Sequence, residues 1–199
     1  MGYLSAKQLP QDRDGFRFRG GSCVIDLAAT LRARLSPAPL ELLGTPADLG
    51  RWLVSSGMVE SMPEVTPDDL LVARALREAI YALAARKGGA KIKEARQTLN
   101  QIAAGSPALP QFKSDGTAML TGSGNALLVS LAREAVQLFG SDMANLVRKC
   151  QSPVCALYFV DTSRKGDRRW CSMSACGNKA KAADFRRRQR RSVKAGKRK

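Results

Sequence analysis

Four cysteines near the end of the chain have the type and spacing of a metal site. Cys150 and Cys155 are separated by four residues, Cys171 and Cys176 by four as well, and 15 residues lie between the pairs. A structural zinc ion takes four ligands in a tetrahedron, and cysteine thiolates bind it at about 2.3 Å. Two short loops that supply two sulfurs each satisfy this geometry when the segment between them turns back. We therefore predict one structural zinc ion held by these four residues.

The alternatives for these cysteines are disulfides, buried free thiols or a catalytic zinc. The first residues contain no apolar signal core, which predicts a cytosolic protein, and paired cysteines in a reducing compartment more often bind metal. Catalytic zinc usually keeps an open position and uses histidine or carboxylate ligands, and this chain has no histidine. The same absence removes the commonest general base, so we expect no enzymatic activity. The fifth cysteine, Cys23, lies in an apolar segment and is predicted to be a core residue.

Basic residues gather beside these cysteines. Of the formal net charge of +16, residues 148–199 carry +14 and residues 1–147 carry +2. Such a segment is typical of a surface that binds a polyanion. A helix is predicted directly after Cys176, and a helix held at its start by a zinc site suits the major groove or the backbone of DNA. The predicted nucleic-acid contacts are Arg168, Arg169, Lys179, Lys181, Arg186, Arg187, Arg190 and Arg191.

Two aromatic residues near the site have alternative roles. Trp170 can stack on a nucleotide, or it can cover the metal site and pack on the upstream domain; its position beside a ligand favours packing. Phe185 is expected to pack back on the zinc module. The last residues, "KAGKRK", are expected to be a solvated tail that is disordered when unbound.

The zinc module is predicted over residues 142–191, before a basic tail over 192–199. The segments "NLVRKC", "ALYFVD" and "RRWCS" have the composition of short strands, and "TSRKGD" that of a turn. These segments predict a zinc-stabilised β-hairpin, which brings the second cysteine pair back to the first, followed by the helix. A module of about 40 residues buries too little apolar surface to fold alone, so the metal must supply much of its folding energy.

Upstream, residues 16–141 predict a mainly α domain with small β elements, after a polar lead-in over 1–15. "FRFRGG" has the alternation of a short strand, and the segment over 106–124 contains a possible hairpin. Thr45 and Thr66 each precede a proline and lie three residues before an acid, which is the signature of a helix start. The predicted helices cover residues 22–35, 45–57, 66–89, 91–105 and 125–140.

The cysteine-rich segment resembles a known bacterial family, the CGNR zinc finger proteins. The resemblance rests on C-x4-C followed by "LYFVDTSRKGDRRWCSMSACGNKAKAADFRRR". "FRFRGGSCVIDLAATL", "TPADLGRWL" and "LREAIYAL" resemble the ABATE domain of stress-induced transcription regulators, so the resemblance spans about residues 16–191. It implies that the four cysteines are the zinc ligands and that the protein binds DNA. Lys179 replaces the arginine of the family pattern, which keeps the charge but loses the planar fork that grips a phosphate or guanine at two points.

The leading hypothesis is a two-part bacterial transcription regulator, cytoplasmic and associated with the nucleoid. The helical domain senses a signal or mediates assembly, for instance as a homodimer, and the zinc module binds duplex DNA; the sequence does not identify a small-molecule ligand. The first alternative is an RNA- or ribosome-associated module, because zinc knuckles and basic tails also serve RNA. A thiol-based redox sensor that releases zinc on oxidation is the second. No segment approaches the roughly 20 apolar residues that span a bilayer, so no membrane partner is expected.

Overall fold

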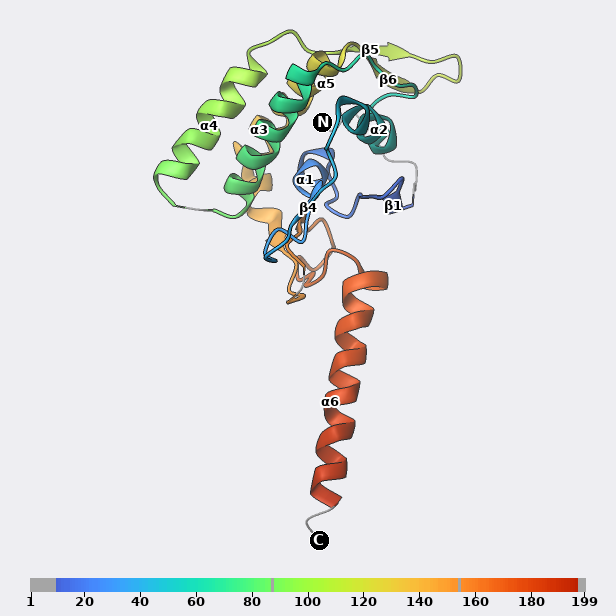
Figure 1. The fold of residues 1–199 in the computed structure, drawn as a ribbon, viewed down its shortest axis with the longest axis vertical. Coiled ribbons are helices and arrows are strands. Elements are labelled where there is room, and N and C mark those ends of the chain that lie inside the picture. Colours follow the sequence, from blue (N-terminus) through green and yellow to red (C-terminus); the bar gives the residue numbers. More distant parts are fainter. Residues whose placement is uncertain (1–9, 87, 154, 197–199) are drawn as a thin grey trace.

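The computed structural model of the chain describes the backbone of residues 10–86, 88–153 and 155–196, and side chains up to Gln189. Figure 1 shows helices α1 to α5 gathered into one body, from one end of which the long helix α6 (Asn178–Gly196) projects. The strands form small antiparallel pairs. This arrangement confirms the predicted mainly helical domain and the smaller module that ends in a helix.

Helices α2 (Pro46–Ser56) and α3 (Pro67–Ala84) begin where the sequence predicts, because each has a complete capping box. The Thr45 side chain accepts a hydrogen bond from the Asp48 backbone N–H, and the Asp48 carboxylate accepts one from the Thr45 N–H. The same exchange occurs at the start of α3. These bonds satisfy N–H groups that the first turn of a helix leaves without partners.

The core lies where α3 packs against α4 (Ala90–Ala103) and α5 (Gly124–Phe139). The short helix α1 (Cys23–Ala28) packs against α3 and α5 near the end of the body from which α6 leaves (Figure 1). Apolar side chains from all these helices and from α2 form one buried cluster. Its largest fully buried members include Trp52, Ile25, Leu27, Leu76, Ile80, Leu127, Leu128 and Leu131.

The predicted helix over residues 22–35 is wrong beyond α1. Three residues after α1 ends, β3 (Leu31–Arg32) begins and pairs with β4 (Leu40–Glu41). The buried Thr30 ends the helix, because its hydroxyl donates to the Leu27 carbonyl at 2.7 Å while its own carbonyl accepts from the Leu42 N–H at 3.0 Å. The carbonyl therefore belongs to the strand pair and not to another turn of helix.

The other strands form three more hairpin-like pairs. They are β1 (Asp12–Arg13) with β2 (Phe16–Arg17), β5 (Leu109–Phe112) with β6 (Ala118–Thr121), and β7 (Val147–Lys149) with β8 (Tyr158–Val160). The second pair is the hairpin expected within residues 106–124. The third pair belongs to the cysteine module, and in its register Val147 lies opposite Val160.

The cysteine module shares the core of the helical domain. Val147 and Val160 belong to the same buried cluster as the helices, and the rings of Tyr158 and Tyr81 meet edge to face with centroids 5.6 Å apart. The Val160 N–H donates to the carbonyl of Gly20 at 2.8 Å. A Cβ at Gly20 would lie 2.7 Å from an Ile25 methyl carbon, so glycine lets this segment pass close to α1. The two parts are thus joined through buried contacts as well as through the chain.

Candidate zinc centre and basic helix

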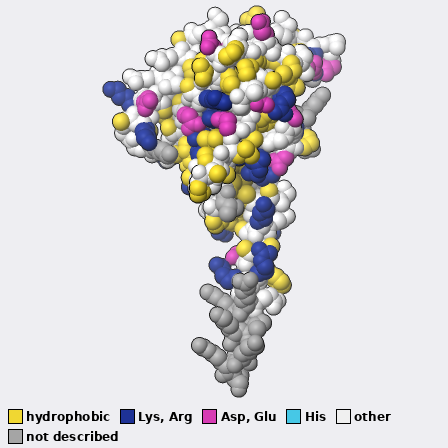
Figure 2. All heavy atoms as spheres, in the orientation of Figure 1, with side chains coloured by type: hydrophobic (Ala, Val, Ile, Leu, Met, Phe, Trp, Pro, Cys, Tyr) yellow, Lys and Arg dark blue, Asp and Glu magenta, His cyan; other side chains and the backbone are white. Residues whose placement is uncertain are grey.

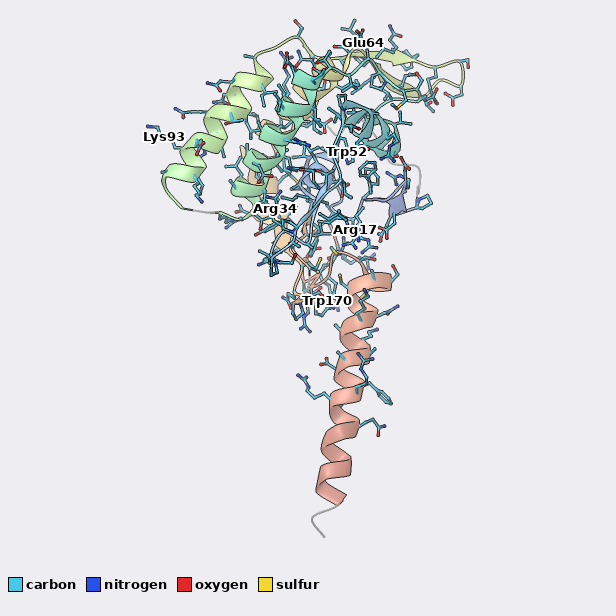
Figure 3. All side chains as sticks on the ribbon, viewed as in Figure 1. Arg17, Arg34, Trp52, Glu64, Lys93 and Trp170 are labelled. Carbon is cyan, nitrogen blue, oxygen red and sulfur yellow. The ribbon has the colours of Figure 1, made fainter. Side chains whose placement is uncertain are left out.

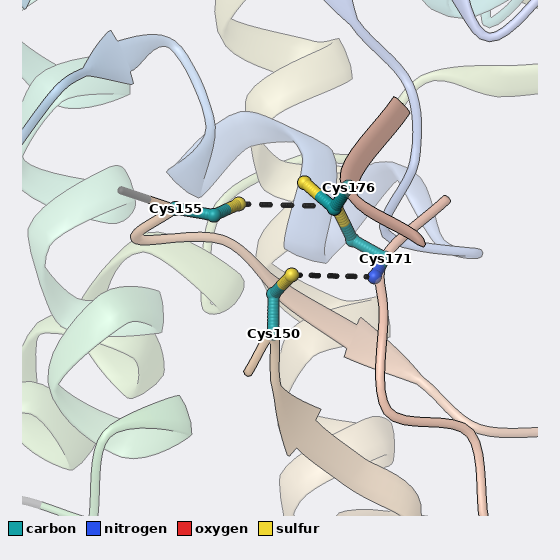
Figure 4. Close-up of side chains that lie close together, drawn as sticks. All are labelled: Cys150, Cys155, Cys171 and Cys176. Atoms are coloured by element: carbon teal, nitrogen blue, oxygen red, sulfur yellow. Dashed lines mark hydrogen bonds between the residues drawn. The ribbon is translucent and has the colours of Figure 1, made fainter. Parts of the chain in front are cut away.

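The four cysteines come together from two loops. Cys150 and Cys155 lie in the connection between β7 and β8. Cys171 lies two residues before the short π-helical turn Met173–Gly177 that leads into α6, and Cys176 lies within this turn. All four side chains are buried, and their sulfur atoms all lie within 4.8 Å of one another (Figure 4).

The sulfur positions fit a tetrahedral zinc ion. The Cys171 Sγ lies 3.8 Å from the Cys155 Sγ and 3.7 Å from the Cys176 Sγ. Four sulfurs at about 2.3 Å from a central ion stand about 3.8 Å apart in a regular tetrahedron. The cluster therefore has the donor set and the spacing of a closed structural zinc site, with no coordination position left for a substrate.

The thiols of Cys150, Cys155 and Cys171 lie close enough to perturb one another's protonation. Hydrogen bonds from Cys155 and Cys171 lower the pKa of Cys150. The hydrogen bond to Cys150 raises the pKa of Cys155, and hydrogen bonding to Cys150 and Cys155 raises the pKa of Cys171 as well. Without a cation these thiols cannot all ionise, since neighbouring thiolates repel. A bound Zn²⁺ removes this limit because it is ligated by thiolates.

The predicted position of the hairpin is wrong. The connection of the β7–β8 hairpin carries the first cysteine pair, so the hairpin does not lie between the two pairs. The segment 168–172 is not a strand; it crosses the first loop, where the Gln151 N–H donates to the Arg169 carbonyl and the Cys171 N–H to the Cys150 Sγ. The Cys171 N–H therefore bonds to the Cys150 sulfur and not to the carbonyl of a neighbouring strand, and the residue types alone do not predict this bond.

Arg168, one of the predicted nucleic-acid contacts, is used inside the module. Its guanidinium donates to the carbonyls of Trp170 and Cys171 and lies 4.6 Å from the ring centroid of the fully buried Phe159. Its backbone N–H donates to the buried Asp161 carboxylate at 2.8 Å. These contacts make Arg168 a support of the second zinc loop, and its guanidinium does not point freely to solvent.

Trp170 has the packing position that the sequence favours. It is half-buried and packs against the cysteine cluster, and the Arg169 guanidinium lies 5.1 Å from its ring centroid. A Cβ at Gly177 would lie 3.3 Å from the Trp170 ring and 2.5 Å from the sulfur of Met173. Glycine at this position therefore lets α6 begin directly against the covered metal site.

Helix α6 carries the other predicted contacts away from the body. Its helical backbone continues to Gly196, past the predicted helix end at residue 191, whereas residues 197–199 lie outside the described part of the chain. Figure 2 shows basic side chains along its described length. The exposed members are Lys179, Lys181, Arg186 and Arg187; the side chains of Arg190 and Arg191 lie outside the described residues.

Phe185 does not pack on the zinc module as expected. Its side chain is 57% exposed, because α6 leaves the body and Phe185 lies about two turns along it. Among the described side chains of α6, Arg187 pairs with Asp184 at 2.9 Å. This exposed pair adds little stability. The main contacts of α6 are with the π-helical turn that carries Cys176.

Three arginines of the helical domain were missed as neighbours of this site. Arg17 and Arg19 lie close enough to Arg32 to reinforce the lowering of its pKa, which burial chiefly causes. Arg19 forms an ion pair with Asp12, and the nearby zinc ligands Cys171 and Cys176 also help to raise its pKa. Figure 3 shows Arg17, like Trp170, at the end of the body from which α6 projects. The signal was present in "FRFRGG", since alternation along a strand turns the arginines away from the buried Phe16.

The fifth cysteine is separate from the cluster. Cys23 is partly buried and packs against the main core, as predicted. Burial raises its pKa to about 12, so its reactive thiolate form is suppressed at neutral pH.

The four buried sulfurs, with the helix that follows them, define a zinc-finger protein. Residues 147–189 match the family model described as the CGNR zinc finger. Residues 21–142 match the model of the ABATE family, described as "Putative stress-induced transcription regulator", and the chain belongs to this family. These matches confirm the resemblance. A comparison with curated proteins found no match, and among the described residues no helix is long and apolar enough to cross a membrane.

Proposed function

We propose that the protein is a bacterial, cytoplasmic transcription regulator whose zinc module aims α6 at duplex DNA. One observation carries this proposal: a basic helix of 19 residues begins two residues after a zinc ligand and leaves the body with its described basic side chains exposed. The metal fixes the start of the helix, and the helix supplies the positive charge. The protein acts by binding and not by catalysis, since all four thiols serve the closed metal site.

Phosphate contacts dominate the proposed interface. Neutralisation of six to ten phosphates gives a log–log dependence of affinity on salt with a slope of roughly −5 to −9. Arg17, at the end of the body from which α6 projects (Figure 3), adds a positive charge near the zinc module. Lys179 acts at this interface as a point charge, because it lacks the fork of the arginine in the family pattern.

The helical domain regulates the zinc module through their shared core. Val147 and Val160 are buried with the helices, and the Val160 N–H donates to Gly20. A rearrangement of α1, α3 or α5 that displaces Val147 or Val160 therefore reaches the strands next to the first cysteine pair. This coupling supports the sensing role of the domain.

RNA binding is the second candidate function. The exposed Phe185 favours it, because an aromatic ring between basic side chains can stack on an unpaired base. A duplex reader gains little from such a ring.

A competition experiment separates the two functions. The full chain, loaded with zinc, is offered sheared genomic DNA and total cellular RNA together at physiological salt, and the retained molecules are sequenced. We expect enrichment of a short duplex motif that Cys171→Ser abolishes and Cys23→Ser leaves unchanged. Both variants remove one thiol, so the comparison isolates the metal site. Enrichment of RNA, or retention without preference that survives Cys171→Ser, would overturn the proposal.

Salt titrations test the role of α6. Arg186→Gln is expected to reduce the slope of log affinity against log salt by about 0.9. Lys93→Gln removes one charge from the exposed face of α4 and leaves the slope unchanged. Equal effects of the two variants would mean that only the net charge matters.

A further inference from the structure

The helical domain contains a cavity next to the zinc module. The cavity of about 500 Å³ opens between α3, α4 and α5 and reaches the 3-10 helix η1 (Asp142–Leu146) and β7. Small-molecule sites commonly have volumes of about 300–1,000 Å³ and apolar walls with a few polar groups. The apolar wall here includes Leu83, Ile92, Leu99, Val136, Phe139 and Val147.

The charged side chains that line this cavity are all positive. Arg86 and Arg96 line it together with Asn100 and Asn145, and no lining residue is acidic. Among the described residues no carboxylate forms an ion pair with either arginine. The cavity thus presents uncompensated positive charge at the edge of an apolar wall.

A neighbouring hollow shows that this charge pattern is not general. That hollow, of about 420 Å³, is lined by residues that include Arg34, Glu78 and Glu94. Arg34 forms an ion pair with Glu78 there. The positive charge of Arg34 is therefore already compensated, whereas the charges of Arg86 and Arg96 in the 500 Å³ cavity are not, within the described part of the chain.

Arg86 is held in an unusual conformation. Its φ of 49° lies in the left-handed region, which residues other than glycine rarely adopt. Its side chain crosses to η1 and donates to the Ala144 carbonyl and to Asn145 Oδ1, each at 3.4 Å. These bonds are long, so the guanidinium is available to a stronger acceptor such as a carboxylate.

We propose that this cavity binds an organic monoanion with an apolar body, such as a medium-chain or aromatic carboxylate. The anionic head lies between Arg86 and Arg96, and the apolar body lies against Leu83, Ile92 and Phe139. A carboxylate gains charge-assisted hydrogen bonds from the arginines, and its body gains burial. An organic cation of the same size lacks the first gain.

The position of the cavity gives the ligand a route to the zinc module. Asn145 and Val147 line the cavity, and the first zinc ligand, Cys150, follows three residues after Val147. An anion that takes Arg86 away from η1 releases the segment that leads into β7. The role of this ligand as an effector of DNA binding rests on the proposed function, whereas the binding itself does not.

The test uses the full chain loaded with zinc, without nucleic acid. Octanoate and octylamine, which share chain length and differ in charge, are titrated by calorimetry. We expect octanoate to bind and octylamine to bind at least tenfold more weakly. Arg96→Gln should weaken octanoate binding about tenfold or more, since it removes hydrogen bonds to a charged group. Lys93→Gln, which removes the same charge from α4 outside the cavity, should leave octanoate binding unchanged.

A second variant tests the apolar part of the site. Val136 lines the cavity and is 38% exposed, so Val136→Trp fills the space from a partly open position and is expected to abolish binding. Far-ultraviolet circular dichroism and zinc content confirm that each variant is folded. Equal binding of octanoate and octylamine, equal loss in Arg96→Gln and Lys93→Gln, or no octanoate binding at millimolar concentration would overturn the proposal. None of these results depends on whether the protein binds DNA.

Discussion

The helical domain and the zinc module are held together by different forces. The helical domain buries a large apolar cluster drawn from five helices, and α1, α2, α3 and α5 each begin at a residue whose side chain caps the helix. The buried cluster of the zinc module consists of the four cysteines and Phe159, with Leu157 and Trp170 packed against it. A cluster this small does not offset the entropy of ordering its loops, so the metal must do so. The two regions should therefore fail under different treatments.

Removal of zinc is expected to cause the largest loss of stability, and this loss should be confined to the zinc module. Structural zinc contributes on the order of 10 kcal/mol to folding of small modules at neutral pH. In the presence of a chelator, amides of residues 150–177 should lose protection from hydrogen exchange, while those around Leu76 in α3 should keep it. Readdition of Zn²⁺ should restore the protection. Loss of protection in both regions would show that the shared contacts at Val147 and Val160 make them one cooperative unit.

Truncation of the apolar core should have the opposite distribution. Leu76 is fully buried, so Leu76→Ala should lower the free energy of unfolding by about 2–5 kcal/mol. Denaturant unfolding measures this loss, and competition with a chromophoric chelator should show unchanged zinc affinity. Leu71→Ala, on the same helix but 61% exposed, should change the stability by less than about 0.5 kcal/mol. A Leu76→Ala variant with weakened zinc affinity would contradict the separation.

Two adjacent arginines sharpen the comparison within the zinc module. Arg168 supports the carbonyls of Trp170 and Cys171, whereas Arg169 is exposed. Arg168→Gln should weaken zinc binding about tenfold or more, because hydrogen bonds from a charged group contribute about 1.5–3 kcal/mol. Arg169→Gln should leave zinc binding unchanged and weaken nucleic-acid binding. The same chelator competition measures both, and equal zinc affinities would refute the supporting role of Arg168.

A buried carboxyl gives the helical domain a smaller, pH-dependent property. Burial raises the pKa of Asp26 to about 7, although the Gly20 N–H donates to it. In the unfolded chain its pKa is about 4, so between these values the folded state holds a proton that the unfolded state has released. The stability contribution therefore falls as pH rises, and between pH 6 and 8 the loss is about 1.4 kcal/mol.

The variant Asp26→Asn isolates this effect. Asparagine imitates the protonated carboxyl and keeps an acceptor for Gly20, so the variant should lack this part of the pH dependence. Denaturant unfolding of both proteins at pH 6 and pH 8, with excess zinc, gives the difference. An identical pH dependence in both proteins would show that Asp26 is ionised throughout that range.

The parts of this structure that were predictable from sequence are those specified by neighbouring residues. Thr66 and Asp69 lie three residues apart and form a capping box. The spacing of the cysteine pairs likewise predicts a metal site. The wrong predictions depend on distant partners. Leu31 leaves the helical pattern because it pairs with Glu41, and Phe185 stays exposed because α6 leaves the body.

The candidate site follows the same rule. Zinc ligands are recognised by residue type, whereas the duty of an arginine depends on what surrounds it. Arg168 and Arg169 are the same residue type, yet Arg168 packs on the buried Phe159, whereas Arg169 stays exposed and donates to the Gln151 side chain. The arginine group around Arg32 is likewise assembled by β2 and β3, from segments that are separate in sequence.

The attachment of α6 at one end has a mechanical consequence. A helix of 19 residues is about 28 Å long, and α6 projects from one end of the body (Figure 1). A tilt of about 10° at its base moves the far end by about 5 Å, which exceeds the spacing of roughly 3.4 Å between successive charges along one DNA strand. In the proposed complex with DNA, the helix would convert a small rearrangement of the zinc loops into a change of register on the nucleic acid.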